Sequence, residues 1–353
     1  QLKPAVGTEE ASSILCDCFY DAGVPGTHLE LLDSSTSAAT DAIDLGVDMV
    51  VLTGAAETGR KVLSSAAPRL SASIMELSGC DAVIVLPGAD LERLTRAVQF
   101  GLEFNGSATC IGPRRLLVSQ SQHGPVIAAL KQRLADEVPV VVHPAARHSV
   151  SVHISSALEC GAIDVLGRFS LDQLRDQGIM YPTLLDRVTS EHSIASADVF
   201  APVLSIITVT DIDHAVRLVN DCPYRLAASV FGPAQVAGHV AARLDVGTVT
   251  VNDLIAPTAD PRLPFGGRGQ SGFGVTRGPE GLLAMTAVKV VSTRRGSVVV
   301  HLRPRSDSDE ATLHGALKVL HGSTLSKKIA GLRRMVALRR PVGGVKKVSP
   351  DGE

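Results

Sequence analysis

The sequence predicts an α/β fold with a mostly parallel sheet, and two observations carry that prediction. Short apolar runs alternate with segments of helical periodicity along most of the 353 residues, which is the order that a parallel sheet requires. Several runs also end in glycine-containing turns that lead into a helix pattern. A hydrophobic content of 45% and a charged content of 20% suit a chain with a sizeable core, and the length predicts two domains with an appendage.

Elements in the first half of the chain follow from periodicity and from local start and stop signals. The strand at 47–52 runs into the turn 53–59, a strand–turn–helix layout that aims helix amides at a phosphate. Asp90 has the chemistry of a helix N-cap. The predicted strands are 29–32, 47–52, 73–77, 82–86 and 115–119, and the predicted helices are 8–22, 36–45, from about 60, 91–104 and 123–134.

The second half is less regular, and residues 144–197 are the hardest to interpret. His143, His148 and His153 recur every five residues, but no carboxylate or cysteine completes a ligand set, so no metal site is expected. The predicted strands are 138–143, 227–231, 247–252 and 288–292, and the predicted helices are 213–220, 235–244, 280–285, 314–321 and 325–338. The last ten or so residues have the composition of a disordered tail.

The cysteines and the hydropathy indicate a cytoplasmic protein with no membrane partner. The six cysteines are scattered without a Cys-x-x-Cys spacing, which is typical of reduced thiols. Cys16 and Cys18 lie within a helical pattern and are expected to be buried structural thiols. No apolar run approaches the roughly 18 to 20 residues that span a bilayer, and the start shows no signal peptide.

Charge is distributed unevenly. Residues 294–353 carry 13 Lys/Arg and 5 Asp/Glu, a net of +8, so the preceding residues carry a net of −10 within the total of −2. A basic tail is able to bind nucleic acid or an anionic surface. Docking on the acidic body or on a neighbouring subunit is the favoured interpretation, because this tail has no aromatic residue on which a base could stack.

Cys110 and Glu76 are the candidate catalytic residues. Cys110 follows a turn of small residues, and Glu76 precedes it by 34 positions in Met75-Glu76-Leu77-Ser78-Gly79. A thiol becomes a nucleophile when it ionises, and a nearby carboxylate is able to serve as a general base. Taken singly, a buried inert cysteine and a solvated glutamate remain the alternatives.

Six segments, in order, resemble motifs of the aldehyde dehydrogenase superfamily: Leu52-Thr53-Gly54, Glu76-Leu77-Ser78-Gly79, Phe104-Asn105 through Cys110, Phe200-Ala201-Pro202-Val203, Val251-Asn252-Asp253, and Pro264-Phe265-Gly266-Gly267 with Ser271-Gly272. The resemblance spans about residues 2–293. It implies an aldehyde dehydrogenase-like α/β fold with a partial Rossmann-like NAD(P)-binding domain at 1–78 and a catalytic domain at 79–262. A return segment with an oligomerisation strand would occupy 263–293, and a basic C-terminal tail 294–353. The first half of the cofactor domain is expected to precede Gln1, so the chain is expected to be N-terminally incomplete.

The resemblance also implies a reaction and a set of contacts. Cys110 would attack an aldehyde to form a thiohemiacetal, hydride transfer to NAD or NADP would give a thioester, and Glu76 would activate water to release a carboxylate. A homodimer or homotetramer is implied as well. The residues implied to contact the cofactor are Lys3, Thr53, Gly54, Gly59, Leu77, Asp198 and Phe200. A surface role for Lys3 and a core role for Phe200 remain the alternatives.

Departures from the family pattern leave two further functions open. Val6 stands where NAD-preferring relatives often have a glutamate that repels the 2′-phosphate, so NADP is expected to be tolerated. Ala55, Ser78, Cys80, Ser107-Ala108 and Asp198 also differ from the usual residues. A non-catalytic paralogue or subunit is one alternative. An enzyme that passes the acyl group to coenzyme A is the other, and Glu76 argues against it because such enzymes lack the hydrolytic glutamate.

Overall fold

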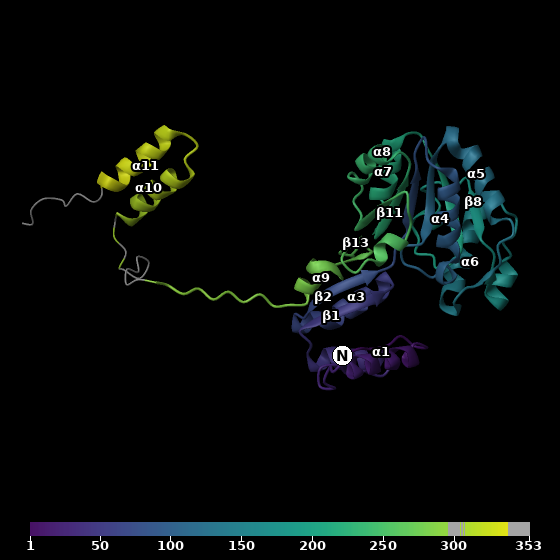
Figure 1. The fold of residues 1–353 in the computed structure, drawn as a ribbon, viewed down its shortest axis with the longest axis horizontal. Coiled ribbons are helices and arrows are strands. Elements are labelled where there is room, and N and C mark those ends of the chain that lie inside the picture. The colour runs from purple at the N-terminus through teal and green to yellow at the C-terminus, as the bar shows by residue number, and fades with distance from the viewer. Residues whose placement is uncertain (296–303, 305, 307, 338–353) are drawn as a thin grey trace, which may run out of the picture. The chain divides into compact units, whose positions relative to one another are not determined.

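The computed structural model describes residues 1–295, 304, 306 and 308–337. The chain divides into two units, Gln1–Ala287 and Val288–Glu353 (Figure 1). The predicted disordered tail lies outside the described residues. Among the helices described, none is long and apolar enough to cross a bilayer.

A seven-stranded sheet forms the centre of the first unit, with the strand order β12-β11-β3-β4-β9-β8-β6. Its strands are β3 (Asp81–Val85), β4 (Pro113–Ser119), β6 (Ile163–Asp164), β8 (Thr183–Asp186), β9 (Val203–Val209), β11 (Ala227–Phe231) and β12 (Thr248–Val251). Neighbouring strands are parallel except for β6 against β8. Every residue of β3 and β11 is buried, as expected of central strands in a sheet covered on both faces.

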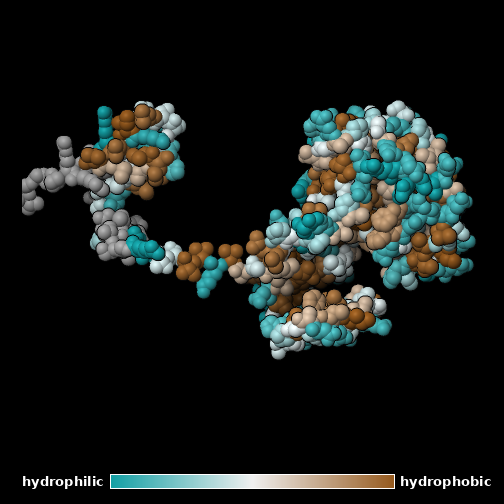
Figure 2. All heavy atoms as spheres, viewed as in Figure 1, coloured by the Kyte–Doolittle hydropathy of each residue, from teal (hydrophilic) through white to brown (hydrophobic). Residues whose placement is uncertain are grey.

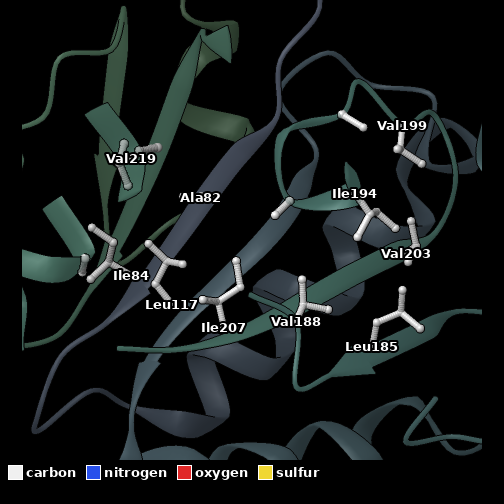
Figure 3. Packing of buried hydrophobic residues seen from close by; sticks show 14 of the residues in the cluster. Ala82, Ile84, Leu117, Leu185, Val188, Ile194, Val199, Val203, Ile207 and Val219 are labelled. Atoms are coloured by element: carbon white, nitrogen blue, oxygen red, sulfur yellow. The ribbon is translucent and has the colours of Figure 1, made fainter. Parts of the chain in front are cut away.

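The two faces of this sheet carry separate cores, because alternate residues of a strand point to opposite sides. Leu117 of β4 belongs to one core, shown in Figure 3 with Ile84 and Ile207, whereas its neighbours Leu116 and Val118 belong to the other. Helices α6 (Pro144–Glu159), α7 (Ile212–Asn220) and α8 (Ala234–Ala241) cover the first core, and α4 (Leu91–Glu103) and α5 (Gln120–Leu134) cover the second.

A smaller sheet contains the first two strands, β1 (Met49–Gly54) and β2 (Ala72–Leu77), in parallel, with β14 (Gly272–Phe273) antiparallel to β2. The remaining elements of this unit are α1 (Glu9–Asp21), α2 (Thr36–Leu45), α3 (Ala56–Ala66), α9 (Gly278–Ala284), the pair β5 (Val140–Val141) with β7 (Ile179–Met180), and the pair β10 (Tyr224–Arg225) with β13 (Arg268–Gly269). Short 3-10 or π turns occupy Ala67–Arg69, Phe104–Ser107, Gln173–Gln177, Ser193–Ser196 and Ala256–Ala259.

Most predicted elements are present, and the differences have physical reasons. The Asp90 side chain accepts a hydrogen bond from Arg93 N and caps α4 as predicted. The predicted strand at 29–32 is reduced to one bridge between Leu2 and Leu31, and the predicted strand at 288–292 pairs with nothing described. A strand needs a sheet edge, and local sequence does not specify whether one is available.

One predicted helix start and one predicted burial need correction, and one helix was not predicted. The helix expected from about residue 60 begins at Ala56, because Ala55 has extended backbone and no side-chain cap marks the start. Helix α6 begins at Pro144, inside the segment that lacked a clear pattern. Cys16 is buried as expected, but Cys18 is exposed, because α1 covers its core on one face alone.

The second unit contains a helical hairpin of α10 (Asp309–His321) and α11 (Leu325–Ala337). The two helices cross closely at Gly315 and Gly331, where a Cβ on either glycine would lie within 3.0 Å of the other's carbonyl oxygen. Exposed apolar side chains cover much of the hairpin surface (Figure 2), among them Leu313, Leu320, Leu325 and Leu332.

Candidate active site

Glu76 lies near the end of β2, between β1 and β14. It pairs in register with Thr53 on one side and with Gly272 on the other. Its Oε1 accepts a hydrogen bond of 3.0 Å from the hydroxyl of Thr276, the last residue of a glycine-rich loop at 263–276. Burial raises the pKa of the Glu76 carboxyl, and Thr276 and Arg277 lower it by less. The carboxylate is therefore a stronger base than an exposed glutamate.

The segment after Glu76 passes directly against the candidate nucleophile. A Cβ on Gly79 would lie 2.6 Å from the Cys110 carbonyl oxygen and 2.7 Å from Asp81 Oδ1, so only glycine fits there. Ser271 fastens this segment, because its hydroxyl donates to the Ser78 carbonyl at 2.7 Å. The loop between β2 and β3 is thus held between the glycine-rich loop and the turn that carries Cys110.

Cys110 follows an unusual turn between α4 and β4. Asn105, Gly106 and Ser107 have φ angles of 51°, 61° and 61°, a left-handed run in which two residues are not glycine. The Asn105 side-chain amide donates to the Ala108 carbonyl at 3.0 Å and supports the turn. Left-handed backbone in such residues costs about 1 kcal/mol each and persists where the surroundings fix it.

The Cys110 thiol is only partly exposed. Burial, followed by the negative charges of Asp81 and Glu76, raises the pKa of this thiol to about 11. The backbone amides of Ile111 and of Cys110 itself act in the opposite direction. The thiol is protonated near neutrality in this state, so a nucleophilic role requires a base or an added positive charge.

Asp81 is a buried carboxyl group at the start of β3, with 5% of its surface exposed. Its Oδ1 accepts a hydrogen bond of 3.1 Å from Ala227 N, and its Oδ2 has no partner among the described residues. Burial raises the pKa of Asp81 well above the usual range. This effect favours the neutral acid, and protonation of Asp81 removes the part of the rise in the Cys110 pKa that comes from the Asp81 charge.

A third segment, residues 198–201, lies beside the turn before Cys110. The Ser107 hydroxyl donates to the Ala201 carbonyl at 3.0 Å, and the Arg114 guanidinium lies 5.8 Å from the ring of Phe200. Asp198 is half-buried, and its Oδ1 has no partner among the described residues. Burial raises the pKa of Asp198, and Ser78 and Arg114 lower it by less. Asp198 and Phe200 therefore lie at the same site as Cys110.

The other candidate cofactor residues lie around β1 and α3. Thr53 and Gly54 end β1, and α3 begins two residues later without a side-chain cap, which leaves its first amides available for a ligand. Packing also favours glycine at position 59, because a Cβ there would lie 2.8 Å from Leu77 Cδ1. The Leu77 amide donates to the Ser271 carbonyl at 3.1 Å.

Lys3 lies apart from this turn. It follows the bridge between Leu2 and Leu31. Hydrogen bonds from Ser35 lower the pKa of Asp33, and the positive charge of Lys3 contributes to that lowering, so Lys3 lies near Asp33. The structure shows no contact between Lys3 and the residues around Cys110.

Sequence reasoning did not identify Thr276, Asp81 or Arg114 as parts of this site. Two consecutive arginines at the start of an apolar strand are unusual, and this feature could have identified Arg114 as a site residue. No sequence feature of this kind marks Thr276. Among the described residues, no group of three or more His, Cys, Asp or Glu side chains is placed to hold a metal ion. His143 instead caps α6, where its Nδ1 accepts from Ala145 N at 3.3 Å.

Comparison with known proteins agrees with this arrangement. The sequence profile of the aldehyde dehydrogenase family matches residues 1–291, so the chain belongs to that family. A putative succinate-semialdehyde dehydrogenase [NADP(+)] 2 of Mycobacterium tuberculosis H37Rv is 31% identical over 309 residues, which cover 83% of this chain and 59% of the relative. A 4,4'-diapolycopene aldehyde oxidase of Methylomonas sp is 30% identical over 292 residues, covering 80% of this chain and 54% of that protein. The chain thus spans just over half the length of these relatives.

Solved structures resemble the fold over a similar span. A Mycobacterium tuberculosis aldehyde dehydrogenase complexed with NAD+ has a TM-score of 0.76 and 29% identity, covering 84% of this chain and 64% of that one. Betaine aldehyde dehydrogenase from Staphylococcus aureus in complex with NAD+ has a TM-score of 0.78 and 26% identity, covering 86% and 63%. The aldehyde dehydrogenase-like α/β fold expected from the motifs is therefore confirmed.

Proposed function

We propose that this chain carries the catalytic residues of an NAD(P)-dependent aldehyde dehydrogenase that oxidises an aldehyde to a carboxylate. The observation that supports this most strongly is the convergence at Cys110. The loop that follows Glu76 lies against the Cys110 carbonyl, and the charge of Glu76 acts on the Cys110 thiol. Membership of the family and relatives named for aldehyde oxidation support the same reaction.

In this proposal the Cys110 thiol releases its proton to solvent and its Sγ attacks the aldehyde carbon, so that a C–S bond forms and the carbonyl π bond becomes an oxyanion. The Cys110 amide is available to donate to that oxyanion. A nicotinamide cofactor, when bound, would accept the hydride released when the C–H bond of that carbon breaks and the oxyanion collapses to the thioester, and its cationic ring would favour the thiolate. Glu76 then takes a proton from water, the water oxygen attacks the thioester carbon, and Sγ leaves as the carboxylate product forms.

The residues present fit a dinucleotide. The orphan Oδ1 of Asp198 is suited to accept from a ribose hydroxyl, and the uncapped start of α3 is suited to a phosphate. Val6 is 82% exposed and carries no charge that would repel a 2′-phosphate. Relatives include one named for NADP(+) and structures in complex with NAD+. We therefore propose that either NAD or NADP serves.

The proposed organisation follows the sequence boundaries: residues 1–78 on the cofactor side, 79–262 catalytic, 263–293 returning to the cofactor side, and 294–353 a basic tail.

We also propose a homo-oligomer. Leu282 and Leu283 of α9 and Met285 directly after it are 71%, 68% and 49% exposed, which is unusual for a cluster of large apolar side chains. A cytoplasmic location follows from the scattered free thiols.

The test is aldehyde-dependent reduction of NAD and NADP, with succinate semialdehyde and betaine aldehyde among the substrates. Cys110→Ala is expected to abolish turnover, and Glu76→Gln to leave a single burst of reduced cofactor because the thioester is not hydrolysed. Cys160→Ala is the matched control, since Cys160 is an exposed thiol at the end of α6. Turnover that survives Cys110→Ala would reject the mechanism.

One observation favours a second candidate, a non-catalytic member of the family. The pKa of Cys110 stands at about 11 with two carboxyl groups near it, which opposes a thiolate. A folded protein that binds NAD by calorimetry but oxidises no aldehyde would favour this candidate. The retained Glu76 argues against the coenzyme A-acylating alternative.

A further inference from the structure

Arg114, the second residue of β4, is a buried cation with an unusual set of partners. It is 3% exposed. Its Nη1 donates to Ser107 Oγ and to the Ala201 carbonyl at 3.0 Å each, and its Nη2 donates to the carbonyls of Ser107 at 2.8 Å and Thr109 at 3.1 Å. In the described part of the chain it forms no close ion pair; all four of these acceptors are neutral oxygens, and the nearby carboxyl groups of Asp198 and Asp81 add a favourable charge.

These partners belong to two segments of the candidate active site. Ser107 and Thr109 form the turn immediately before Cys110, and Ala201 follows Phe200. The turn contains the left-handed run at 105–107, which would relax if nothing fixed it. Arginine is suited to fix it, because its guanidinium presents five donors in a rigid plane and keeps its charge.

The neighbouring Arg115 shows that this arrangement is specific to Arg114. Arg115 is 4% exposed and donates instead to the Cys80 carbonyl at 3.0 Å and to the Leu218 carbonyl at 2.8 Å. Consecutive strand residues point to opposite faces, so the two arginines diverge. Arg114 holds the turn before Cys110, and Arg115 links the residue before β3 to the end of α7.

We propose that Arg114 is a positioning residue that sets the direction of the Cys110 side chain and ties its turn to the 198–201 segment. The proposal rests on the proposed function, in which Cys110 is the nucleophile. A nucleophile displaced by about 1 Å loses roughly 100-fold in rate. Arg114 touches no reacting atom and acts through the backbone of the turn.

Arg114→Met and Arg115→Met form a matched pair, because each removes a buried arginine of nearly equal exposure. The readouts are kcat, KM for the aldehyde, and the rate at which iodoacetamide alkylates Cys110 in the full chain. Arg114→Met is expected to lower kcat roughly 10- to 100-fold, to leave KM within about twofold, and to change the alkylation rate at least threefold. Arg115→Met is expected to lower the melting temperature to a similar degree but to change kcat and alkylation less than Arg114→Met does, because Arg115 holds the loop between β2 and β3 and makes no hydrogen bond to the turn before Cys110. Equal effects of the two variants on kcat and alkylation would overturn the proposal.

Ser107→Ala decides the question if Arg114→Met does not fold. It keeps Arg114 and the direct bond from Arg114 to the Ala201 carbonyl, and it removes the hydroxyl that accepts from the guanidinium and donates to the same carbonyl. A loss of roughly 2- to 10-fold in kcat is expected, the range for one hydrogen bond, with a melting temperature near wild type. Unchanged kcat and alkylation in Ser107→Ala would refute the positioning role.

The alkylation assay separates this proposal from the proposed function. It needs neither aldehyde nor cofactor, so it measures the Cys110 turn even in a chain that shows no turnover. Altered alkylation in Arg114→Met, with no aldehyde oxidation by wild type, would uphold the positioning role and reject the reaction. A wild-type Cys110 that does not react with iodoacetamide would refute both.

Discussion

Thr276→Val removes the hydrogen bond that the Glu76 side chain accepts from the glycine-rich loop, while keeping the side-chain volume. The Thr276 hydroxyl donates to Glu76 Oε1 at 3.0 Å and lowers the pKa of Glu76, which burial has already raised. A hydrogen bond to a charged group contributes about 1.5–3 kcal/mol. Because Glu76 is only half-buried, about 1 kcal/mol is the appropriate figure after solvent screening.

Losing that energy raises the pKa of Glu76 further, since about 1.4 kcal/mol corresponds to a tenfold change in the ionisation equilibrium. The active base is the carboxylate, so activity is lost as pH falls through the pKa of Glu76. The acidic limb of the pH profile of kcat is therefore expected to move upward by about 0.5–1 unit in Thr276→Val, with the plateau at higher pH nearly unchanged.

The assay is the pH profile of aldehyde-dependent NAD reduction, measured from about pH 5 to 9. Thr276→Ser keeps the hydroxyl and is expected to keep the wild-type limb. Thr286→Val is a surface control, because the Thr286 hydroxyl donates only to the exposed Leu283 carbonyl at 2.8 Å. A limb that stays in place, or that moves to lower pH, would refute the reasoning.

The remaining predictions concern the loop between β2 and β3. Burial raises the pKa of Asp81, so the folded state retains a proton that the unfolded state releases, and its stability falls as pH rises above about 3.8. Asp81→Asn is expected to flatten that fall between pH 4 and 8, measured by urea unfolding, and an unaltered slope would contradict the assignment. Gly79→Ala places a Cβ 2.6 Å from the Cys110 carbonyl and is expected to destabilise by about 1–3 kcal/mol and to disturb Cys110 alkylation. Gly238→Ala, in open space on α8, is the control and should stabilise by up to about 1 kcal/mol.

Much of the fold was predictable because its central strands are continuous apolar runs between clear turn signals. The strand at 227–231 and the helix at 36–45 have the predicted bounds. Helix α6 was not predictable in the same way, because β-branched and polar residues interrupt its apolar positions and its start depends on Pro144. The predicted strand at 288–292 has no pairing partner among the described residues, and local sequence does not specify whether a sheet edge is available to it.

The candidate catalytic residues were predictable from sequence motifs, but the residues that hold them in place were not. Cys110 and Glu76 stand in recognisable motifs, and the structure brings the loop after Glu76 against Cys110. Thr276 lies 200 residues from Glu76 in sequence, and no local pattern indicates that the two side chains meet. Contacts over such a separation come from the way the sheets assemble, which periodicity does not report.

The residues around Cys110 and Glu76 are expected to decide whether the site is active. They set the protonation state of these two groups and the direction of their side chains. The thiol of Cys110 has a pKa of about 11, so its reactivity depends on which charges surround it when substrate arrives. A neutral Asp81 removes one opposing charge, Glu76 accepts a proton more readily for being buried, and Arg114 holds the turn in a conformation that its own residues disfavour. Each effect comes from the burial of a polar side chain, and the fold must compensate that burial. Replacing Asp81, Glu76 or Arg114 is therefore expected to change the stability of the protein and the reactivity of Cys110 together.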